Sequence, residues 1–534
     1  MRQVPAENFG YWCSAAVGAW PDKTCLVDLS GDRVREVTYA KLDDGMNRVA
    51  SLLIETGLEP GDRLAMAVGN RVEFIEIFFG AMRVGVVPVP LNTRQGSDTL
   101  AYIVEDAGCV GAFVEPEACP RAVQVVESAG VPHRWVIPVA PGGGRLDHSP
   151  SVGAAPGGDP GQGWLDYSTS VRAASATFEA PRILGDHPSF QPYTSGSTGR
   201  PKGVVLTHGG QLWWVRCLQK YWPAKPKARA LAAVPLYHKN AMAGAVKPML
   251  QAGGSVVLLP DFAPERFLRT LAEYRCTTAG AVPAVFTLLL QHRELIDSLD
   301  FSALESLKIG SAPVQEELLH EVEAAFGVTV GESYGLTEGG PVMIGPPLDG
   351  GAVPVGSCGV AWPEGEIRLV GPDGEDSRSD GELWVRNPGV TPGYHNLPRV
   401  NSERLVDGWL ATGDLFHRDA GGFFYFRGRT DDMFNSGGEN IYPKEVENLL
   451  LAHPDVADAA VVSVPHDVKG NVPAAMVMLR PGAVADEESL KAYTLEEGPA
   501  YAHPRRIAIV DEMPLGGPGK VDRAAVSAFF TALT

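Results

Sequence analysis

QPYTSGSTGRPKGVVLTH, at residues 191–208, gathers four hydroxyl side chains, three glycines and a lysine within residues 194–203. Gly196, Gly199 and Gly203 let the backbone approach a ligand closely and adopt conformations that other residues avoid. Successive main-chain amides in such a loop can form a concave anion site, and Lys202 adds a positive charge. The hydroxyl donors are Thr194, Ser195, Ser197 and Thr198. The run therefore predicts a loop that binds the phosphates of a nucleotide.

This run differs from the phosphate loop of Walker-type nucleoside triphosphatases, which reads GxxxxGK[ST]. Here Pro201 rather than glycine precedes Lys202, and Gly203 rather than serine or threonine follows it. A Walker-type enzyme is therefore disfavoured. The alternative is a flexible Gly/Ser loop that binds no ligand. The close and regular spacing of hydroxyls and glycines makes this the weaker interpretation.

Upstream of the loop, short apolar runs alternate with helical stretches. Residues 62–68 (DRLAMAV) and 85–90 are typical of buried strands, and residues 50–55 and 74–84 are typical of helices. Such alternation predicts βαβ units and a mostly parallel sheet. Residues 141–163 are rich in glycine and proline. They predict a flexible surface insertion within this pattern, because they cannot bury enough apolar surface to offset the cost of ordering.

Downstream, a second βαβ-like block covers about 185–345, with strands predicted at 230–235 and 255–260 and a helix at 267–274. Past Gly356, short strands separated by glycine turns predict a β-rich subdomain; they lie at 366–370, 381–385 and 422–427. From Lys444 the pattern is helix, strand at 459–464, strand at 474–479, helix and strand. The expected fold class is α/β: a large N-terminal domain of two βαβ-type subdomains plus a small β-rich subdomain, followed by a small α+β C-terminal domain.

Composition and charge narrow the functional classes. The 534-residue chain has a formal net charge of −19, which works against non-specific binding to nucleic acid. The seven cysteines are odd in number and show no CxxC spacing, which disfavours a disulfide framework or a zinc site and fits a reducing compartment. The first ten residues carry no apolar signal core, and no apolar stretch approaches the ~18–20 residues of a membrane span. We expect a cytoplasmic protein without integral membrane association, and a homodimer is left open.

The run at 191–208 closely resembles the phosphate loop of the adenylate-forming superfamily, which includes acyl-CoA synthetases, luciferases and peptide-synthetase adenylation domains. Four further segments match this family in the family's order, and the resemblance covers about residues 10–525. These segments are GESYGLTE at 331–338, GWLATGD at 408–414, FRGRTDDMFNSGGENIYP at 426–443 and PLGGPGKVDR at 514–523.

The resemblance implies a nucleotide site built on ATP. Tyr334 would stack on adenine, Thr337 would contact the α-phosphate, and Glu338 would bind Mg²⁺, for which a carboxylate oxygen is a suitable ligand. Asp414 would accept hydrogen bonds from both ribose hydroxyls, since a carboxylate offers two acceptor oxygens, and Arg429 would contact the ribose. The complete expected set is Thr194, Ser195, Gly196, Ser197, Thr198, Gly199, Lys202, Ser311, Glu332, Ser333, Tyr334, Thr337, Asp414 and Arg429.

The same resemblance implies a mobile C-terminal domain over 430–534 that swings at Asp431 against an N-terminal domain over 1–429. Lys520 would be the catalytic lysine of adenylation, acting with Thr337, Glu338 and Lys202. Gly437 and Gly438 would shape the tunnel for the pantetheine arm of coenzyme A. The chain departs from the usual family pattern at Gly517–Pro518 and at Tyr501–Ala502, which leaves the conformation of the lysine loop and some coenzyme A or phosphate contacts in doubt.

The acyl site is marked by PLYHKN at 235–240, in which His238 resembles the family's residue at the mouth of the acyl pocket. Relatives that act on apolar acids generally carry apolar residues at the next two positions, so Lys239 and Asn240 suggest a polar group or a second carboxylate on the acid. Further expected lining residues are Gly310, Ser311, Gly335 and Met343. Small residues leave room for a ring, which favours an aromatic or medium-sized cyclic acid over a long fatty chain.

The function implied is that of an ATP-dependent carboxylic acid–CoA ligase, which forms an acyl-adenylate and then an acyl-CoA with release of pyrophosphate and AMP. Three alternatives stay open: an adenylation enzyme that loads a carrier protein in trans, a luciferase-type oxidation, and a non-catalytic nucleotide-binding homologue. A degenerate homologue should have lost Lys520, Glu338 or Asp414, and all three are present.

Overall fold

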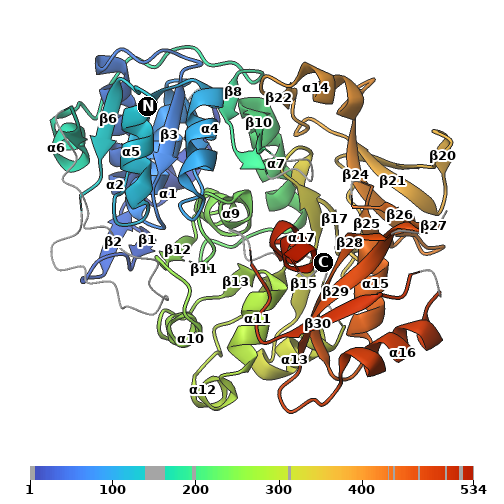
Figure 1. The fold of residues 1–534 in the computed structure, drawn as a ribbon. Coiled ribbons are helices and arrows are strands. Elements are labelled where there is room, and N and C mark those ends of the chain that lie inside the picture. The colour runs from blue at the N-terminus through green and yellow to red at the C-terminus, as the bar shows by residue number, and fades with distance from the viewer. Residues whose placement is uncertain are drawn as a thin grey trace.

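The computed structural model describes residues 6–138, 163–194, 200–310, 314, 316–430, 432–436, 439–466, 469–499, 502–515 and 521–532. Two mostly parallel sheets with their helices come first along the chain, and a β-rich part and a small α+β part follow (Figure 1). The predicted α/β architecture is therefore confirmed. The Gly/Pro-rich insertion predicted at 141–163 lies, but for Gly163, outside the described residues. Within the part of the chain that the structure describes, no helix is long and apolar enough to cross a membrane.

The first predicted βαβ block forms a parallel five-stranded sheet in the order β4–β3–β5–β6–β7. Its last three strands are β5 (Cys109–Val114), β6 (His133–Val136) and β7 (Leu165–Asp166). As predicted, strands β3 (Arg63–Ala67) and β4 (Val87–Pro90) are joined by helix α3 (Val72–Arg83). Both strands are almost wholly buried, as is usual for parallel strands with helices on both faces. The helix predicted at 50–55 is the last part of a longer helix, α2 (Tyr39–Glu55).

The second predicted block forms a seven-stranded sheet in the order β15–β14–β13–β11–β12–β1–β2. One side of it consists of β13 (Thr278–Ala281), β14 (Ser306–Ile309) and β15 (Val330–Glu332). Strands β11 (Arg229–Ala232) and β12 (Ser255–Leu258) confirm the predicted strands, and α10 (Pro264–Glu273) confirms the predicted helix. Each strand stops before the proline that closes the apolar run, Pro235 or Pro260. The carboxyl ends of β11, β13, β14 and β15 point the same way because these strands pair in parallel.

The N-terminal segment completes this second sheet. Strand β1 (Thr24–Asp28) pairs in parallel with β12, and β2 (Arg35–Thr38) pairs antiparallel with β1 at the edge. In the register, Asp28 lies opposite Leu258. The second sheet is therefore built from two parts of the chain that lie on either side of the whole first block.

The β-rich part consists of antiparallel strands whose order is β20–β19–β21–β24–β23, with β25 added to β24. The two outer strands in this order are short, β20 (Asp376–Ser377) and β23 (Leu405–Val406). Strands β19 (Glu366–Val370), β21 (Asp380–Arg386) and β25 (Phe424–Arg429) correspond to the three predicted strands. Strand β24 (Trp409–Arg418) lies between β21 and β25 and carries the GWLATGD motif except for its first residue.

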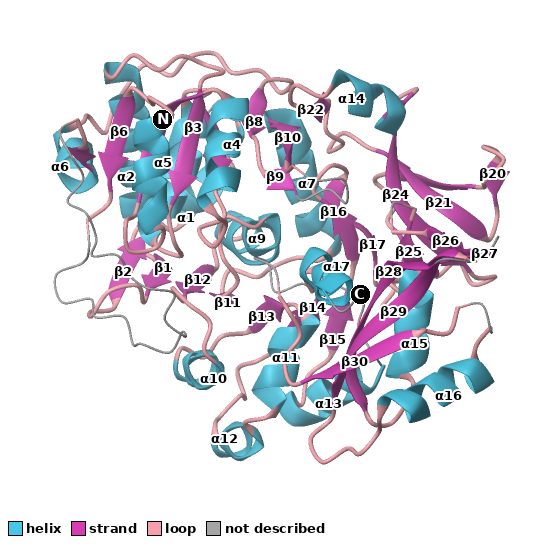
Figure 2. Cartoon of the chain, in the orientation of Figure 1, coloured by secondary structure: helices cyan, strands magenta, loops and turns pink. Residues whose placement is uncertain are grey.

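The C-terminal part is a three-stranded sheet with helices beside it (Figure 2). Its elements are α15 (Pro443–Leu451), β28 (Val456–His466), β29 (Gly470–Leu479), α16 (Glu487–Glu497), β30 (Arg506–Val510) and α17 (Arg523–Ala532). All but α17 match the sequence prediction, which ended on the strand. Val526 and Phe530 of α17 are buried in a cluster with residues of β28 and β29, so this short helix depends on the sheet that it covers. Arg480, which directly follows β29, has its Nη1 3.9 Å from Oε1 of Glu321 in the N-terminal part.

A lysine is buried in the N-terminal core. Lys247 begins α9 (Lys247–Gln251) and has none of its surface exposed. Its Nζ donates to Oε1 of Gln211 at 3.0 Å. Four aromatic rings surround the same nitrogen at 4.7–5.9 Å from their centroids, namely Phe9, Phe78, Phe190 and Trp214. Burial, and next the charge of Lys239, hold the pKa of Lys247 well below its usual range.

Lys247→Met is expected to raise the melting temperature at pH 7, by about 1 °C for each kcal/mol gained in a chain of this length. Below the usual lysine pKa the unfolded chain binds a proton at this position that the folded chain does not bind, so stability increases with pH. Methionine removes this difference and fits an aromatic surrounding, although Gln211 loses a donor, at a cost of about 1 kcal/mol. The gain should therefore be larger at pH 7 than at pH 9.5 in thermal melts.

Lys227→Met provides the control, because Lys227 is exposed and its replacement should leave the melting temperature unchanged at both pH values. An equal fall in melting temperature for Lys247→Met at both pH values would contradict the prediction. It would mean that the ammonium stays charged among the rings.

Candidate active site

The buried carboxylate of Asp414, a predicted ribose residue, joins the other ribose residue, Arg429, to the predicted adenine residue, Tyr334. Asp414 on β24 lies directly opposite Arg429 on β25, and Arg429 Nη1 donates to Asp414 Oδ1 at 2.7 Å. The hydroxyl of Tyr334, on β16 (Tyr334–Leu336), donates to Asp414 Oδ2. Only 8% of the Asp414 side chain is exposed. The structure therefore brings together three residues that the sequence assigned to one nucleotide.

The ring of Tyr334 is held by a second aromatic residue. Its centroid lies 4.7 Å from that of Phe416, at an interplanar angle of 76°. Burial, and then the charge of Asp414, raise the pKa of Tyr334 well above its usual value. The phenol thus remains a hydrogen-bond donor across the physiological range, and the stacking of adenine on this ring stays a prediction.

The two ends of the predicted phosphate loop face each other. Strand β9 (Tyr193–Thr194) pairs antiparallel with β10 (Lys202–Thr207), and Lys202 lies opposite Thr194. The five residues between them that carry most of the hydroxyls and glycines, 195–199, lie outside the described residues. The described strands nevertheless fix where the loop begins and ends.

Glu338 lies beside these loop ends. Its Oε1 accepts hydrogen bonds from Thr194 Oγ1 at 3.4 Å and from the hydroxyl of Tyr394 at 3.2 Å. Tyr394, on β22 (Gly393–Tyr394), pairs with β10 opposite Val204, and Lys202 Nζ lies 5.9 Å from the Tyr394 ring centroid. Sequence reasoning missed Tyr394, because its position depends on how β22 pairs with a strand far away in the sequence.

Two further predicted nucleotide residues lie at the carboxyl ends of neighbouring parallel strands. Glu332 ends β15 (Val330–Glu332) and pairs with Ile309, after which Gly310 follows directly. Burial raises the pKa of Glu332 to about 7. Ser333 follows Glu332, and among the described residues a Cβ placed on Gly310 would meet the Ser333 carbonyl oxygen alone, at 3.9 Å. This edge of a parallel sheet is where ligands usually bind in α/β folds.

The predicted acyl segment lies against the turn that carries Thr337. His238 caps the short helix α8 (Lys239–Ala241), and its ring centroid lies 4.5 Å from that of Tyr237. Lys239 Nζ donates to the carbonyl oxygens of Thr337 at 2.5 Å and Leu336 at 3.4 Å. Burial lowers the pKa of Lys239 to about 7, against the opposing effect of the Glu338 charge.

The other predicted acyl residues are spread more widely. Gly335 is exposed on β16. Met343 is buried in an apolar cluster with Ile344 and Leu383 and lines a small cavity together with Trp213 and Trp362. The side chain of Asn240 is not among those described.

Several other predicted residues lie outside the described residues altogether: Ser195, Gly196, Ser197, Thr198, Gly199, Ser311, Asp431, Gly437, Gly438 and Lys520.

The donor set fits a magnesium ion that is shared with substrate phosphates. Across the described ranges, no three His, Cys, Asp or Glu residues lie close enough to form a metal site of their own. Mg²⁺ is commonly bound by one or two carboxylates together with nucleotide phosphates. A carboxylate has about four acceptor positions, so Glu338 can accept from Thr194 and Tyr394 and still bind a cation.

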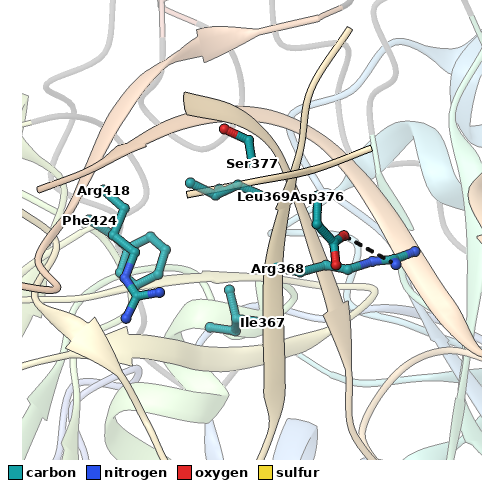
Figure 3. A pocket seen from close by; sticks show the side chains of 7 residues that line it. All are labelled: Ile367, Arg368, Leu369, Asp376, Ser377, Arg418 and Phe424. Atoms are coloured by element: carbon teal, nitrogen blue, oxygen red, sulfur yellow. Dashed lines mark hydrogen bonds and ion pairs between the residues drawn. The ribbon is translucent and has the colours of Figure 1, made fainter. Parts of the chain in front are cut away.

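A separate cavity of about 150 Å³ lies in the β-rich part (Figure 3). It is lined by Ile367, Arg368, Leu369, Asp376, Ser377, Arg418 and Phe424. The guanidinium of Arg368 is 3.4 Å from Asp376 and lies over the rings of Trp384 and Trp409. None of the predicted site residues that the structure describes lines this cavity, so we assign it no part in the predicted site.

Comparison with protein families gives two matches in succession. The model of the AMP-binding enzyme family matches residues 13–395, and the model of the AMP-binding enzyme C-terminal domain matches residues 445–520. The first match contains the phosphate loop and the acyl segment, and the second ends at Lys520.

The chain is also similar to characterised proteins along nearly its whole length. It is 32% identical to feruloyl-CoA synthase from Amycolatopsis sp over 96% of this chain and 98% of that protein. It is 31% identical to sulfoacetate–CoA ligase from Cupriavidus necator over 94% of each chain. The crystal structure of ATP-bound MatB from Rhodopseudomonas palustris superposes with a TM-score of 0.83, at 27% identity, over 98% of this chain and 99% of that chain.

Proposed function

The chain belongs to the AMP-binding enzyme family, and from this we infer that it is an ATP-dependent, AMP-forming acid–CoA ligase. It activates a carboxylic acid as its acyl-adenylate with release of pyrophosphate, and it transfers the acyl group to coenzyme A with release of AMP. The observation that carries this conclusion is the similarity to CoA ligases over 94–96% of the chain.

In the first step, a carboxylate oxygen of the acid attacks the α-phosphorus of ATP, and the bond to pyrophosphate breaks. Two anions meet, so we propose that positive charge and hydrogen-bond donors are placed where they meet. The proposed groups are Lys202, Lys520 and the hydroxyls of Thr194 and Thr337. The support for Lys202 and Thr194 is their opposed position on β10 and β9.

We propose that Glu338 holds Mg²⁺. When bound, the ion would neutralise charge on the nucleotide phosphates. Glu338 supports this role by its place beside Thr194 and Lys202 at the ends of the phosphate loop. Its carboxylate is oriented by Tyr394, whose hydroxyl donates to Oε1.

In the second step the thiol of coenzyme A attacks the acyl carbon of the mixed anhydride, and AMP leaves. We propose that the domain over 430–534 rotates at Asp431 between the two steps. Lys520 would then withdraw from the adenylate, and Gly437 and Gly438 would shape the passage for the pantetheine arm. The succession of two family matches, with a break between residues 395 and 445 that spans Asp431, agrees with this division.

For the acid we propose an aromatic or medium-sized cyclic compound. The space beside Gly310, where an added Cβ would meet no atom of the described residues closer than 3.9 Å, supports a ring at the end of β14 (Ser306–Ile309). Feruloyl-CoA synthase and indoleacetate–CoA ligase are named for ring-containing acids, and sulfoacetate–CoA ligase is named for a small acid with a second anionic group. A polar or dicarboxylic acid is thus the second candidate.

A panel of carboxylic acids supplied with ATP, Mg²⁺ and coenzyme A tests the function. We expect AMP, pyrophosphate and an acyl-CoA in equal amounts, measured by pyrophosphate release and thioester mass. Replacing coenzyme A by a carrier protein distinguishes the carrier-loading alternative, and oxygen uptake distinguishes a luciferase-type oxidation. Formation of ADP, or no AMP with any acid, would overturn the assignment.

We further propose a cytoplasmic location and a homodimer, the latter testable by light scattering.

A further inference from the structure

Lys239 links two segments of the site that lie far apart in the sequence. It is the first residue of α8, directly after His238 at the proposed acyl pocket. Its side chain leaves this segment and ends on the turn between β16 and β17 (Gly340–Gly345). That turn carries Thr337 and Glu338.

The ammonium of Lys239 bonds to main-chain oxygens. It donates to the Thr337 carbonyl at 2.5 Å and to the Leu336 carbonyl at 3.4 Å. An ammonium group has three N–H donors, and the described contacts use two of them on consecutive peptide groups of one turn. Burial lowers the pKa of Lys239 to about 7, and the negative charge of Glu338 opposes this effect by favouring the charged form. The Lys239 side chain is therefore directed at the turn that carries Thr337 and Glu338.

The helix that carries Lys239 is irregular. The short α8 continues as a π-helix over Met242–Val246 and then as α9. Such widened turns are frequent at functional sites. The π-helix and α9, which follow α8, are firmly packed, since Met242, Val246 and Leu250 are each at most 2% exposed. Their burial fixes the position of α8 and hence of Lys239.

We propose that Lys239 is a positioning residue for adenylation, which fixes the main chain at Thr337 and Glu338 relative to the mouth of the acyl pocket at His238. This inference rests on the proposed ligase function. It differs from a role in recognising the acid, because the ammonium is bound to the turn. The Lys239 side chain thereby keeps the acid site and the phosphate site at a fixed position relative to each other.

The consequence is a specific pattern in the kinetics. Small misplacements of reacting groups cost on the order of 10²-fold in rate. In Lys239→Met the turn loses its ammonium partner, so kcat for acid-dependent ATP–pyrophosphate exchange should fall by about 10–100-fold. The KM for the acid should stay within about twofold for apolar and for dicarboxylic acids alike, since no contact to the acid is removed.

The test compares Lys239→Met, Lys239→Arg and wild-type enzyme on one apolar and one dicarboxylic acid. Lys239→Arg keeps donors that reach the two carbonyls and should recover part of the lost kcat. Lys227→Met is the matched control, an exposed lysine that should leave both constants unchanged. Melting temperatures of all variants show that each is folded.

A fall in kcat shared by both acids, with partial recovery in Lys239→Arg, supports the inference. It is overturned by a rise in KM confined to the dicarboxylic acid, which would make Lys239 a residue that recognises the acid. Unchanged kinetics in Lys239→Met would overturn it as well. Failure of the wild-type enzyme to form AMP from any acid is a different result, because it would overturn the ligase function itself.

Discussion

Asp414→Asn should lower kcat/KM for ATP by about 10²–10³-fold. The proposed contacts to the two ribose hydroxyls are hydrogen bonds to a charged group, each of which contributes about 1.5–3 kcal/mol, and about 1.4 kcal/mol corresponds to a tenfold change. Asparagine keeps the shape of Asp414 but presents an N–H group to Arg429 or to Tyr334, both of which donate to the carboxylate. Steady-state kinetics with ATP as the varied substrate measures the loss.

A nucleotide that lacks one ribose hydroxyl tests the proposed contact between Asp414 and the ribose directly. With wild-type enzyme, 2′-deoxy-ATP should be a poorer substrate than ATP by about 10–100-fold, because a hydrogen bond to a charged group contributes about 1.5–3 kcal/mol. In Asp414→Asn this preference should shrink towards unity. Equal losses for ATP and 2′-deoxy-ATP in the variant, with the preference unchanged, would show that Asp414 acts only on the fold.

Asp380→Asn is the control for this substitution. Asp380 lies in the same sheet, 65% of its side chain is exposed, and its Oδ1 is 2.8 Å from His417. An exposed pair of this kind contributes about 0–1 kcal/mol. The control variant should therefore keep the kcat/KM for ATP of the wild-type enzyme.

Lys520→Ala should lower the rate of acyl-adenylate formation by about 10²–10³-fold, the usual effect of removing one group that stabilises developing charge. Thioester formation from supplied acyl-adenylate should continue at nearly the wild-type rate, because the proposed rotation at Asp431 takes Lys520 away from that step. Pyrophosphate exchange measures the first half-reaction, and thioester mass measures the second.

Lys469→Ala, a lysine replacement elsewhere in the same domain, should leave both half-reactions unchanged. Equal losses in both half-reactions for a folded Lys520→Ala enzyme would contradict the two-conformation proposal. The lysine would then act on the common binding of the adenylate instead.

Much of the fold could be predicted from the sequence because hydrophobic periodicity reports local structure. The strands β3, β4 and β12 and the helices α3 and α10 each carry their own apolar pattern, and the structure confirms them. The helix α17 was missed, since a short helix of mostly small residues owes its stability to the sheet that buries Val526 and Phe530. Its existence is decided by tertiary packing.

Some residues of the site could be predicted from the sequence and others could not. The residue types near Asp414 and Glu338 could be predicted from ordered motifs, and the structure brings Tyr334, Asp414 and Arg429 together. Tyr394 could not be predicted, because only the register of β22 on β10 brings its hydroxyl to Glu338. The direction of Lys239 was equally hidden, because a sequence shows that a lysine follows His238 but not which carbonyl groups its ammonium reaches.

The pairing of β1 with β12 has a consequence for biosynthesis. At about 5–20 residues per second, a ribosome needs roughly 10–50 s to move from Asp28 to Leu258. Throughout that interval the nascent N-terminal hairpin lacks the neighbour beside which it finally lies, and an unpaired strand edge invites aggregation. A fragment that stops after the first sheet would retain this exposed edge permanently, whereas removing the hairpin would leave β12 as the new border of the second sheet.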